Sequence, residues 1–451
     1  MYLAYSLLLT LGLLVLIPHF LYQVLAHGKY IDGLRQRLGS LQQIPKFSQP
    51  VIWLHCVSVG ETQAARPLVK RLRDEFPDHA LVISTITATG QKLAQQVFAN
   101  DAAAIFYFPF DWRWTVRRAL RKVNPHVVLI LETELWPNFL RECRKQRIPV
   151  GLVNGRISRQ SFRRYRLIRF FLRKVLADLN LAVMQTEGDA DRIADLGLSR
   201  DKLFFSGNLK FDVGSSSVDL SATEAIKSRF GIQPETLLLL AASTHGPEEK
   251  IMLESYQHLQ KQFNLRLIIA PRKPERFQEV ANLIESSGLT WTRRTSSAQP
   301  SDASVDVILL DTIGELPATY PLAAIVFVGG SIVDRGGHNV LEPAAAGACV
   351  ITGHNTDNFQ VIVRLLNEAH AIVQLPPLEI RKAADCLTHE LKELLTDNER
   401  RIELGERAQK LVEDNQGAAD RTMDIIRPLV NRSSVEKSEP ITLLATDIPN
   451  T

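Results

Sequence analysis

The sequence predicts an α/β protein with two Rossmann-like domains that face each other across a cleft. Its 451 residues are more than one ordinary hydrophobic core holds, so two domains of roughly 170 to 200 residues are expected. Short apolar segments alternate with segments of helical periodicity, which is typical of parallel sheets covered by helices. A Ser/Asp-rich segment, residues 214–222, divides this alternation into two series.

Each series contains five expected strands, with helical segments such as residues 62–76 between them. Ligands of such folds bind at the carboxyl ends of the strands, so the polar motifs that follow the strands are candidate site residues. The expected strands are residues 51–57, 81–85, 104–108, 127–131 and 150–153 in the first series, and 237–242, 265–270, 305–310, 324–328 and 349–352 in the second.

The N-terminus predicts a membrane anchor. Residues 1–28 contain no Lys, Arg, Asp or Glu, and the apolar stretch just reaches the roughly 20 residues that span a bilayer. A cleavable signal peptide is disfavoured because the start lacks basic residues, and a buried first helix is the other alternative. Lys29 and two arginines follow at once, which places the rest of the chain in the cytoplasm. The expected domains are an anchor (1–28), an N-terminal domain (29–214), a C-terminal domain (215–432) and a disordered tail (433–451).

Charge is distributed unevenly between the two halves. Residues 1–214 carry 30 Lys and Arg against 17 Asp and Glu, whereas the remainder carries 23 against 32. Residues 155–174 contain eight basic and no acidic residues, interleaved with aromatic ones, and predict a basic amphipathic helix. An anionic membrane surface is therefore a better partner than nucleic acid, because the aromatics form one apolar stripe and not a stacking platform. A solvated basic face is the alternative.

The cysteines indicate reduced thiols. Cys56, Cys143, Cys349 and Cys386 have no Cys-x-x-Cys spacing, so neither a disulfide nor a metal site is expected from them. No His-x-x-x-His arrangement suggests a metal either.

A glycine-rich segment, residues 329–347, follows an expected strand and opens a helix near Asn339. Paired glycines let backbone N–H groups approach phosphate oxygens, and the positive end of the helix favours an anion. Glu342 in the first turn can accept hydrogen bonds from both hydroxyls of a ribose. The segment thus predicts a nucleotide-sugar pocket, although a strand-to-helix turn that needs glycine for its geometry alone remains the alternative.

Acidic residues follow two strands of the first series. Glu61 is expected at a helix N-terminus, where the positive helix end favours the ionised form that a general base needs. An ordinary capping residue is the alternative. Glu132 and Glu134 follow the strand at 127–131, and only one of them is expected to reach the cleft, because alternate residues of an extended segment point to opposite faces. Lys210 at the domain border is a candidate for holding an anionic substrate group.

Three further motifs follow strands of the second series. Residues 243–249 carry helix-start chemistry, and residues 271–276 include Arg272, whose guanidinium can form a fork to phosphate or carboxylate. In residues 311–316, the backbone and Glu315 could contact a base or a ribose.

Seven of these motifs occur in the order seen in 3-deoxy-D-manno-octulosonic acid (Kdo) transferases of Gram-negative bacteria, which the chain resembles over nearly its whole length. The motifs are residues 58–61, 132–138, 208–212, 243–249, 271–277, 311–316 and 329–342. The resemblance implies a GT-B fold, CMP-Kdo as donor and a lipid A precursor (lipid IVA) as acceptor. No metal cofactor is expected, because Arg272 and helix N-termini can meet the charge of the departing phosphate. It also implies a location at the cytoplasmic face of the inner membrane.

The resemblance implies a role for each matching residue. Glu61 matches the general base of an inverting transfer, and Glu132 and Lys210 match residues that support the transition state. The residues that match CMP-binding segments are Pro271, Arg272, Ile313, Gly314, Glu315, Asn339, Val340, Leu341 and Glu342. Some members of the family have Pro where this chain has Val340. Another GT-B glycosyltransferase, a sugar-nucleotide epimerase and a non-enzymatic membrane adaptor are the alternatives.

Overall fold

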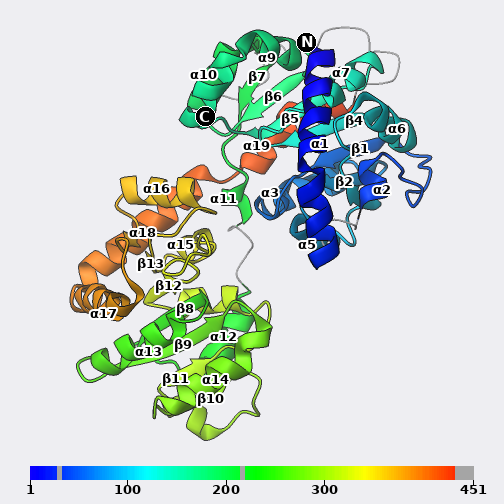
Figure 1. Cartoon of the computed structure of the whole chain (residues 1–451). Coiled ribbons are helices and arrows are strands. Elements are labelled where there is room, and N and C mark those ends of the chain that lie inside the picture. The colour runs from blue at the N-terminus through cyan, green and yellow to red at the C-terminus, as the bar shows by residue number, and fades with distance from the viewer. Residues whose placement is uncertain (28–32, 214–218, 432–451) are drawn as a thin grey trace. The chain divides into compact units, whose positions relative to one another are not determined.

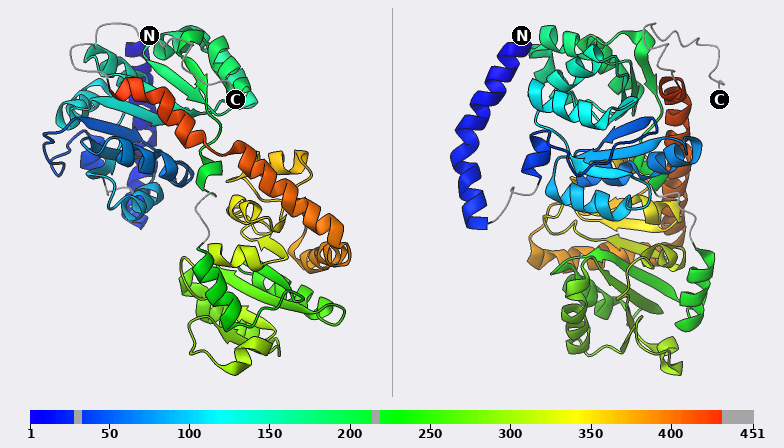
Figure 2. Two further views of the ribbon diagram at one scale, coloured as in Figure 1. Left: turned by 180° about the vertical axis from the view of Figure 1, so that it is seen from behind. Right: turned by 90° about the vertical axis from the view of Figure 1, so that its right-hand side faces the viewer.

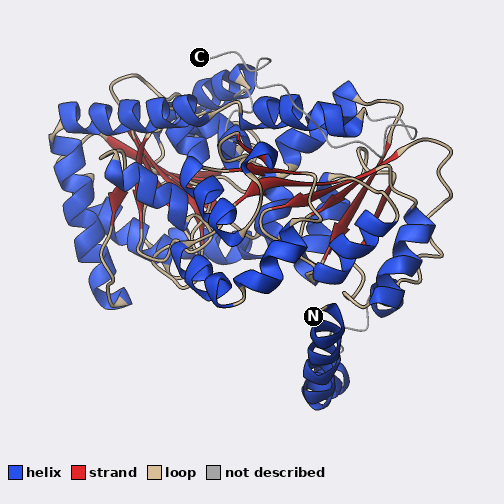
Figure 3. Ribbon diagram, turned by 90° about the horizontal axis from the view of Figure 1, so that it is seen from above, coloured by secondary structure: helices blue, strands red, loops and turns tan. Residues whose placement is uncertain are grey.

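The computed structural model describes the backbone of residues 1–27, 33–213 and 219–431, and the side chains of these residues except 16–27. The chain divides into two compact units: unit 1 contains residues 1–213 and 416–451, and unit 2 contains residues 214–415. In each unit a parallel sheet lies between layers of helices (Figures 1 and 3). The prediction of two Rossmann-like α/β domains is confirmed. The expected disordered tail, 433–451, lies outside the described residues.

Unit 1 has a seven-stranded sheet in the order β3-β2-β1-β4-β5-β6-β7, and every neighbouring pair is parallel. The order reverses between β1 and β4, which is the topological switch point of a doubly wound sheet. The strands are β1 Val51–His55, β2 Ala80–Thr85, β3 Ala104–Tyr107, β4 Val127–Leu131, β5 Val150–Gly155, β6 Leu181–Met184 and β7 Leu203–Phe205.

Most helices of unit 1 connect these strands, whereas α1 and α2 precede the first strand, α11 follows the last, and α19 comes from the end of the described chain. They are α1 Tyr2–His27, α2 Leu34–Arg37, α3 Val59–Ala64, α4 Arg66–Glu75, α5 Ala88–Val97, α6 Arg113–Val123, α7 Pro137–Lys145, α8 Arg159–Leu167, α9 Arg169–Leu176, α10 Glu187–Leu196, η1 Arg200–Lys202, α11 Lys210–Val213 and α19 Ala418–Val430.

Unit 2 also has a seven-stranded parallel sheet, in the order β10-β11-β9-β8-β12-β13-β14, and its switch point lies between β8 and β12. The strands are β8 Leu237–Thr244, β9 Leu265–Pro271, β10 Trp291–Arg293, β11 Val307–Leu309, β12 Ile325–Val328, β13 Cys349–Thr352 and β14 Val373–Gln374. The helices are α12 Leu220–Arg229, α13 Glu248–Leu259, η2 Pro274–Arg276, α14 Phe277–Ser286, η3 Pro300–Ser304, η4 Leu316–Leu322, α15 Leu341–Ala345, α16 Gln360–Glu368, α17 Ile380–Thr396 and α18 Asn398–Asn415.

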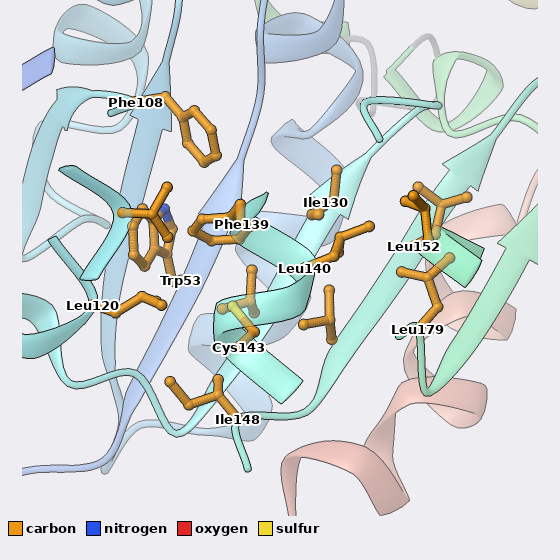
Figure 4. Close-up of a cluster of buried hydrophobic side chains, with 14 of the residues drawn as sticks. Trp53, Phe108, Leu120, Ile130, Phe139, Leu140, Cys143, Ile148, Leu152 and Leu179 are labelled. Atoms are coloured by element: carbon orange, nitrogen blue, oxygen red, sulfur yellow. The ribbon is translucent and has the colours of Figure 1, made fainter. Parts of the chain in front are cut away.

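Helices cover both faces of the unit 1 sheet, so its strands are apolar throughout. Successive residues of β1 enter different cores: Trp53 packs with Phe139 of α7 on one face, whereas Leu54 packs on the other (Figure 4). The rings of Trp53 and Phe139 meet edge to face with centroids 5.3 Å apart, and Trp53 Nε1 donates to Ser84 Oγ at 2.8 Å. This packing fixes the carboxyl end of β1, which leads into the candidate site.

The second core of unit 1 is closed by α19, which lies across the sheet (Figure 2, left). Met423 and Ile426 of this helix are buried in that core. Asp212 accepts hydrogen bonds from the N–H groups of Gly417 and Ala419 at 2.7 and 2.6 Å, which fixes the start of the helix. The expected C-terminal domain, 215–432, therefore extends too far, because the chain returns to unit 1 at residue 416.

Helix α1 lies beside unit 1 and contacts it through polar side chains (Figures 1 and 2). Tyr2 donates to Asp178 at 3.0 Å, Asn138 donates to Ser6 at 3.0 Å, and Trp112 donates to Thr10 at 3.0 Å. Among the described residues, no helix is long and apolar enough to span a bilayer. The transmembrane anchor predicted for residues 1–28 is thus not found in the described part of the chain.

The basic run also differs from the expectation of one helix. β5 ends at Gly155, and the run then forms α8 and α9, which are separated at Ile168. Ile168 has φ −115° and ψ 20°, outside the helical region, so the two helices have separate axes. Leu167 and Phe170 at this break are 87% and 73% exposed.

Candidate active site

Two glutamates lie at the switch point of unit 1. Glu61 is in the first turn of α3, just after β1, and Glu132 directly follows β4, the strand beside β1. The carboxyl ends of these two strands are where doubly wound folds bind ligands. The sequence-based placement of both residues at strand ends is therefore correct.

The side chain of Glu61 is held in place by its own helix terminus. Its Oε2 accepts a hydrogen bond from the N–H of Val57 at 2.8 Å, and its Oε1 accepts from Ser58 Oγ at 3.0 Å. Ser58 caps the same helix, since its Oγ accepts a hydrogen bond from the N–H of Glu61. Glu61 is 5% exposed, and its carboxyl group is fixed in orientation by these bonds.

The ionisation of Glu61 is opposite to the expectation from the helix end. Burial and the nearby charge of Glu132 raise the pKa of Glu61 to about 8, which outweighs the hydrogen bonds from Val57 and Ser58. The helix terminus does not overcome desolvation, because α3 has only six residues. At pH 7 the group is mostly protonated, and it becomes a base near pH 8.

Glu132 and Glu134 both act on Glu61, contrary to the expectation that only one faces the site. Both carboxylates raise the pKa of Glu61, and burial together with Glu132 raises that of Glu134. Glu132 has φ 54°, in the left-handed region, so the segment turns at once and the alternation of an extended strand does not apply. Such a backbone conformation in a non-glycine residue is often found at functional sites.

This cluster predicts a pH dependence. If Glu61 accepts the proton, it must be ionised, so kcat/KM should rise about tenfold per pH unit below pH 8 and level off above it. Glu132→Gln removes a like charge and should move the rising limb to lower pH, whatever it does to the maximal rate. Values of kcat/KM measured from pH 5.5 to 9.5 with purified donor test this. If the rising part of the pH profile kept its position in Glu132→Gln, the electrostatic effect of Glu132 on Glu61 would be contradicted.

Lys210 begins α11, which packs against α3 and α4. Its N–H donates to Asn208 Oδ1 at 3.0 Å, and the N–H of Leu209 donates to Asn154 Oδ1 at 3.1 Å. Asn154, at the end of β5, is fully buried and has φ 54°. The segment that carries Lys210 is thus tied to the sheet and placed beside the helix that carries Glu61.

Asp111 is a site residue that sequence reasoning missed. It is 2% exposed, and its carboxylate accepts hydrogen bonds from the N–H groups of Asn138 and Phe139 at 3.0 and 2.8 Å. Burial raises the pKa of Asp111 to about 7 despite these bonds. The residue holds the first turn of α7 and thereby the loop after Glu132. The only sign in the sequence is an Asp shortly after the expected strand at 104–108.

At the switch point of unit 2, cationic side chains surround a pair of histidines. The Nε2 atoms of His245 and His338 are 2.9 Å apart, and their rings are stacked. Burial and then Arg272 lower the pKa of His338 to about 4, and burial followed by Arg335 lowers that of His245. Neutral imidazoles beside arginines form a donor-rich surface that suits an anionic group. Arg272 is predicted from the sequence, whereas the two histidines lie within the motifs at 243–249 and 329–342 without a predicted role.

The glycine-rich loop after β12 is held by Glu248 of α13. The carboxylate of Glu248 is fully buried and accepts hydrogen bonds from the N–H groups of His245, Gly330, Ser331 and Ile332 at 2.9, 2.7, 3.0 and 3.0 Å. A Cβ on Gly329 would lie 2.8 Å from the Glu248 carboxylate. The N–H groups of residues 330–332 are therefore not free to bind phosphate, because a carboxylate of the protein already accepts their hydrogen bonds. The nucleotide-sugar pocket expected in residues 329–347 stays a prediction for the rest of the segment.

Comparisons with known proteins identify a family. A family model described as 3-deoxy-D-manno-octulosonic-acid transferase (kdotransferase) matches residues 32–213. A 3-deoxy-D-manno-octulosonic acid transferase of Haemophilus influenzae is 34% identical over 90% of this chain and 93% of its own. The chain belongs to the Kdo transferase family. A second such transferase, of Bordetella pertussis, is 32% identical over 83% of this chain and 86% of its own.

The Kdo transferase assignment makes this chain a glycosyltransferase. Its fold is similar to a solved UDP-GlcNAc 2-epimerase of Neisseria meningitidis, with a TM-score of 0.54 over 84% of this chain and 100% of that chain. The identity of 13% makes this a likeness of fold alone, and it agrees with the predicted GT-B class.

In this transferase, the residues expected to bind the donor substrate lie at the carboxyl edge of the unit 2 sheet. Pro271 ends β9, and the side chain of Arg272 is exposed, as is that of Ile313 beside Gly314. Glu315 pairs with Arg294 at 2.7 Å. Only backbone groups of Val340 and Leu341 can face a ligand, because their side chains are buried.

The helix expected from near Asn339 is short in this transferase. α15 contains only residues 341–345, so it supplies little of the helix-end charge expected from the sequence. Glu342 accepts a hydrogen bond from Asn339 Nδ2 at 3.0 Å and lies 3.4 Å from the hydroxyl of Tyr320. Its carboxylate is therefore positioned before any ligand binds.

The cysteines of the transferase are free thiols, and three of the four are buried. Within the described ranges, no group of three or more His, Cys, Asp or Glu side chains could hold a metal ion.

Proposed function

We propose that this chain transfers Kdo from CMP-Kdo to a lipid A precursor, lipid IVA, with inversion at the anomeric carbon. The observation that carries the proposal is Glu61, a buried and oriented carboxyl group with a pKa of about 8 at the switch point of unit 1. A group with a pKa near the working pH is an effective general base. The relatives support the sugar, since they are themselves named as transferases of this acid.

In the proposed reaction, the ionised carboxylate of Glu61 takes the proton of an acceptor hydroxyl. The oxygen then forms a bond to the anomeric carbon of Kdo while the bond from that carbon to the CMP phosphate breaks. Lys210 and Glu132 support the charge distribution around the reacting sugar. The negative charge of the departing phosphate is met by Arg272 and its cationic neighbours.

A lipid acceptor agrees with the surface of unit 1. α8 and α9 carry the basic run, and the side chains of Leu167 and Phe170 are exposed between its arginines. An anionic, apolar surface such as the cytoplasmic face of an inner membrane complements this combination. We therefore propose that the enzyme works there.

The decisive experiment incubates the purified chain with purified CMP-Kdo and lipid IVA. Mass spectrometry should show the acceptor mass increased by one or more Kdo residues. The same acceptor offered with UDP-sugars is the control for donor choice. Transfer from a UDP-sugar, without transfer from CMP-Kdo, would overturn the proposal.

We also propose that transfer needs no metal ion, since cationic side chains stabilise the leaving phosphate. Activity should persist in EDTA when the donor is supplied ready-made. Complete inhibition that magnesium reverses would contradict this.

Arg272→Ala should weaken binding of CMP by about 10- to 100-fold, the usual effect of losing a hydrogen bond to a charged group. Arg407→Ala on α18 is the matched control, because it removes an exposed arginine that pairs with Glu403. Calorimetric titration of CMP into both variants measures the effect. Equal dissociation constants for Arg272→Ala and the unchanged chain would place the phosphate elsewhere.

A further inference from the structure

An open pocket of about 480 Å³ lies in unit 1 at the N-terminal end of α1. Its volume is within the roughly 300 to 1,000 Å³ that is usual for small-ligand sites. Three helices line the pocket. α1 supplies Tyr2, the last turns of α7 supply three residues, and α9 supplies Lys174, which is followed by two further lining residues after the helix. The lining residues are Tyr2, Arg141, Arg144, Lys145, Lys174, Ala177 and Asp178.

The pocket is strongly cationic, with four basic side chains and the single carboxylate of Asp178. That carboxylate is already engaged, because it pairs with Arg144 at 2.8 Å and accepts a hydrogen bond from Tyr2 at 3.0 Å. Arg141 lies over the ring of Tyr2 and Lys174 over that of Phe170, and neither has a carboxylate partner among the described residues. Their charges are therefore available to an anion.

The pocket lies at the opposite edge of the sheet from the candidate active site. α7 begins just after the strand end that carries Glu132, whereas Arg144 and Lys145 are in its last turn. The nine residues of α7 extend for about 13 Å. A ligand in the pocket is thus separate from the reacting groups at Glu61.

The surroundings of the pocket are apolar and exposed, which indicates a lipid source for the anion. On α1, six of the exposed apolar side chains recur at intervals of three and four and so share one face, opposite the polar contacts of Tyr2, Ser6 and Thr10. Exposed apolar residues also lie at the junction of α8 and α9, next to Lys174. The residues of these two surfaces are Leu3, Leu7, Leu8, Leu11, Leu14, Val15, Leu167, Ile168 and Phe170, and the exposed Leu13 of α1 lies outside them.

We propose that this pocket binds the headgroup phosphate of an anionic glycerophospholipid, such as phosphatidylglycerol, while the lipid's acyl chains lie along the exposed face of α1. Arg141 and Lys174 bind the phosphate oxygens, and Asp178 holds Arg144 and Tyr2 in position. The lipid is a bound membrane component and not a reactant. The proposal does not depend on which sugar the enzyme transfers.

The test is a titration of the full chain with dihexanoyl-phosphatidylglycerol below its micellar concentration, followed by calorimetry. We expect one saturable site and a loss of affinity of about tenfold or more in Arg141→Gln/Lys174→Gln, since each basic residue at an anionic lipid contributes about a factor of five. Arg163→Gln/Arg164→Gln is the matched control, because it removes two exposed charges from α8 that do not line the pocket. Thermal melting confirms that both variants fold.

Two further arms identify the source of the phosphate. Dihexanoyl-phosphatidylcholine and inorganic phosphate should each bind at least about fivefold more weakly than phosphatidylglycerol, because the first is not anionic and the second lacks an apolar part. Inorganic phosphate that binds as tightly as the lipid would show a site for a free anion and overturn the proposal. Equal losses in the two double variants would overturn it as well, since the basic face as a whole, and not the pocket, would then bind the lipid.

Discussion

Glu61→Gln should lower turnover by about 10²- to 10⁴-fold, with little change in the affinity for CMP. The amide keeps the size of the side chain but cannot take a proton. Because the pKa of Glu61 is about 8, the carboxyl group is mostly neutral at pH 7, and a neutral amide should leave the stability there nearly unchanged. The loss of rate can therefore be separated from unfolding by measuring both in the same buffer.

Glu187→Gln is the matched control for this variant. Glu187 also occupies the first turn of a helix in unit 1, α10, but it is exposed and lies outside the carboxylate cluster. Its substitution should leave turnover within about twofold, as is usual for surface substitutions. Near-normal turnover in Glu61→Gln would remove this residue from the mechanism.

Glu248→Ala should have the largest effect on unit 2. The substitution leaves four N–H groups without an acceptor, three of them buried, and each buried group costs about 1–3 kcal/mol when water does not replace the carboxylate. We expect the amides of residues 330–332 to lose protection in hydrogen exchange measured by mass spectrometry. The affinity for CMP should fall together with that protection.

Glu254→Ala on the same helix is the control, because Glu254 makes only a partly exposed ion pair with Lys250 at 3.8 Å. Such pairs contribute about 0 to 1 kcal/mol. If the glycine-rich loop of Glu248→Ala kept its protection, water would be satisfying these N–H groups, and the carboxylate would not be the element that holds the loop.

The long strands could be predicted from sequence because the apolar pattern that indicates each of them lies within the strand itself. The expected strand at 127–131 has the bounds that the structure gives β4, since five apolar residues lie between polar segments. β7, β10 and β14 were missed, because strands of two or three partly exposed residues carry no pattern. β6 was missed although it is buried, since four apolar residues that follow a helical segment have the same pattern as the last turn of that helix.

The site could be predicted in part for the same reason. Glu61, Glu132 and Arg272 follow apolar strands, so their placement needs only the rule that ligands meet strand ends. The ionisation of Glu61 depends on burial and on Glu132, which is 71 residues away in the sequence. The partner of the glycine-rich loop, Glu248, is likewise 82 residues away from Gly330. Contacts at such separations leave no pattern that a single sequence shows.

The return of α19 to unit 1 has a consequence for the order of synthesis. The first 213 residues leave the ribosome with part of one face of their sheet uncovered, because one of the helices that cover it is the last helix of the described chain. Unit 2, which is continuous in sequence, is complete before that helix exists. At the usual 5–20 residues per second, the uncovered part waits for about 10–40 s. A nascent chain of this enzyme is thus expected to depend on chaperones for its first half and not for its second.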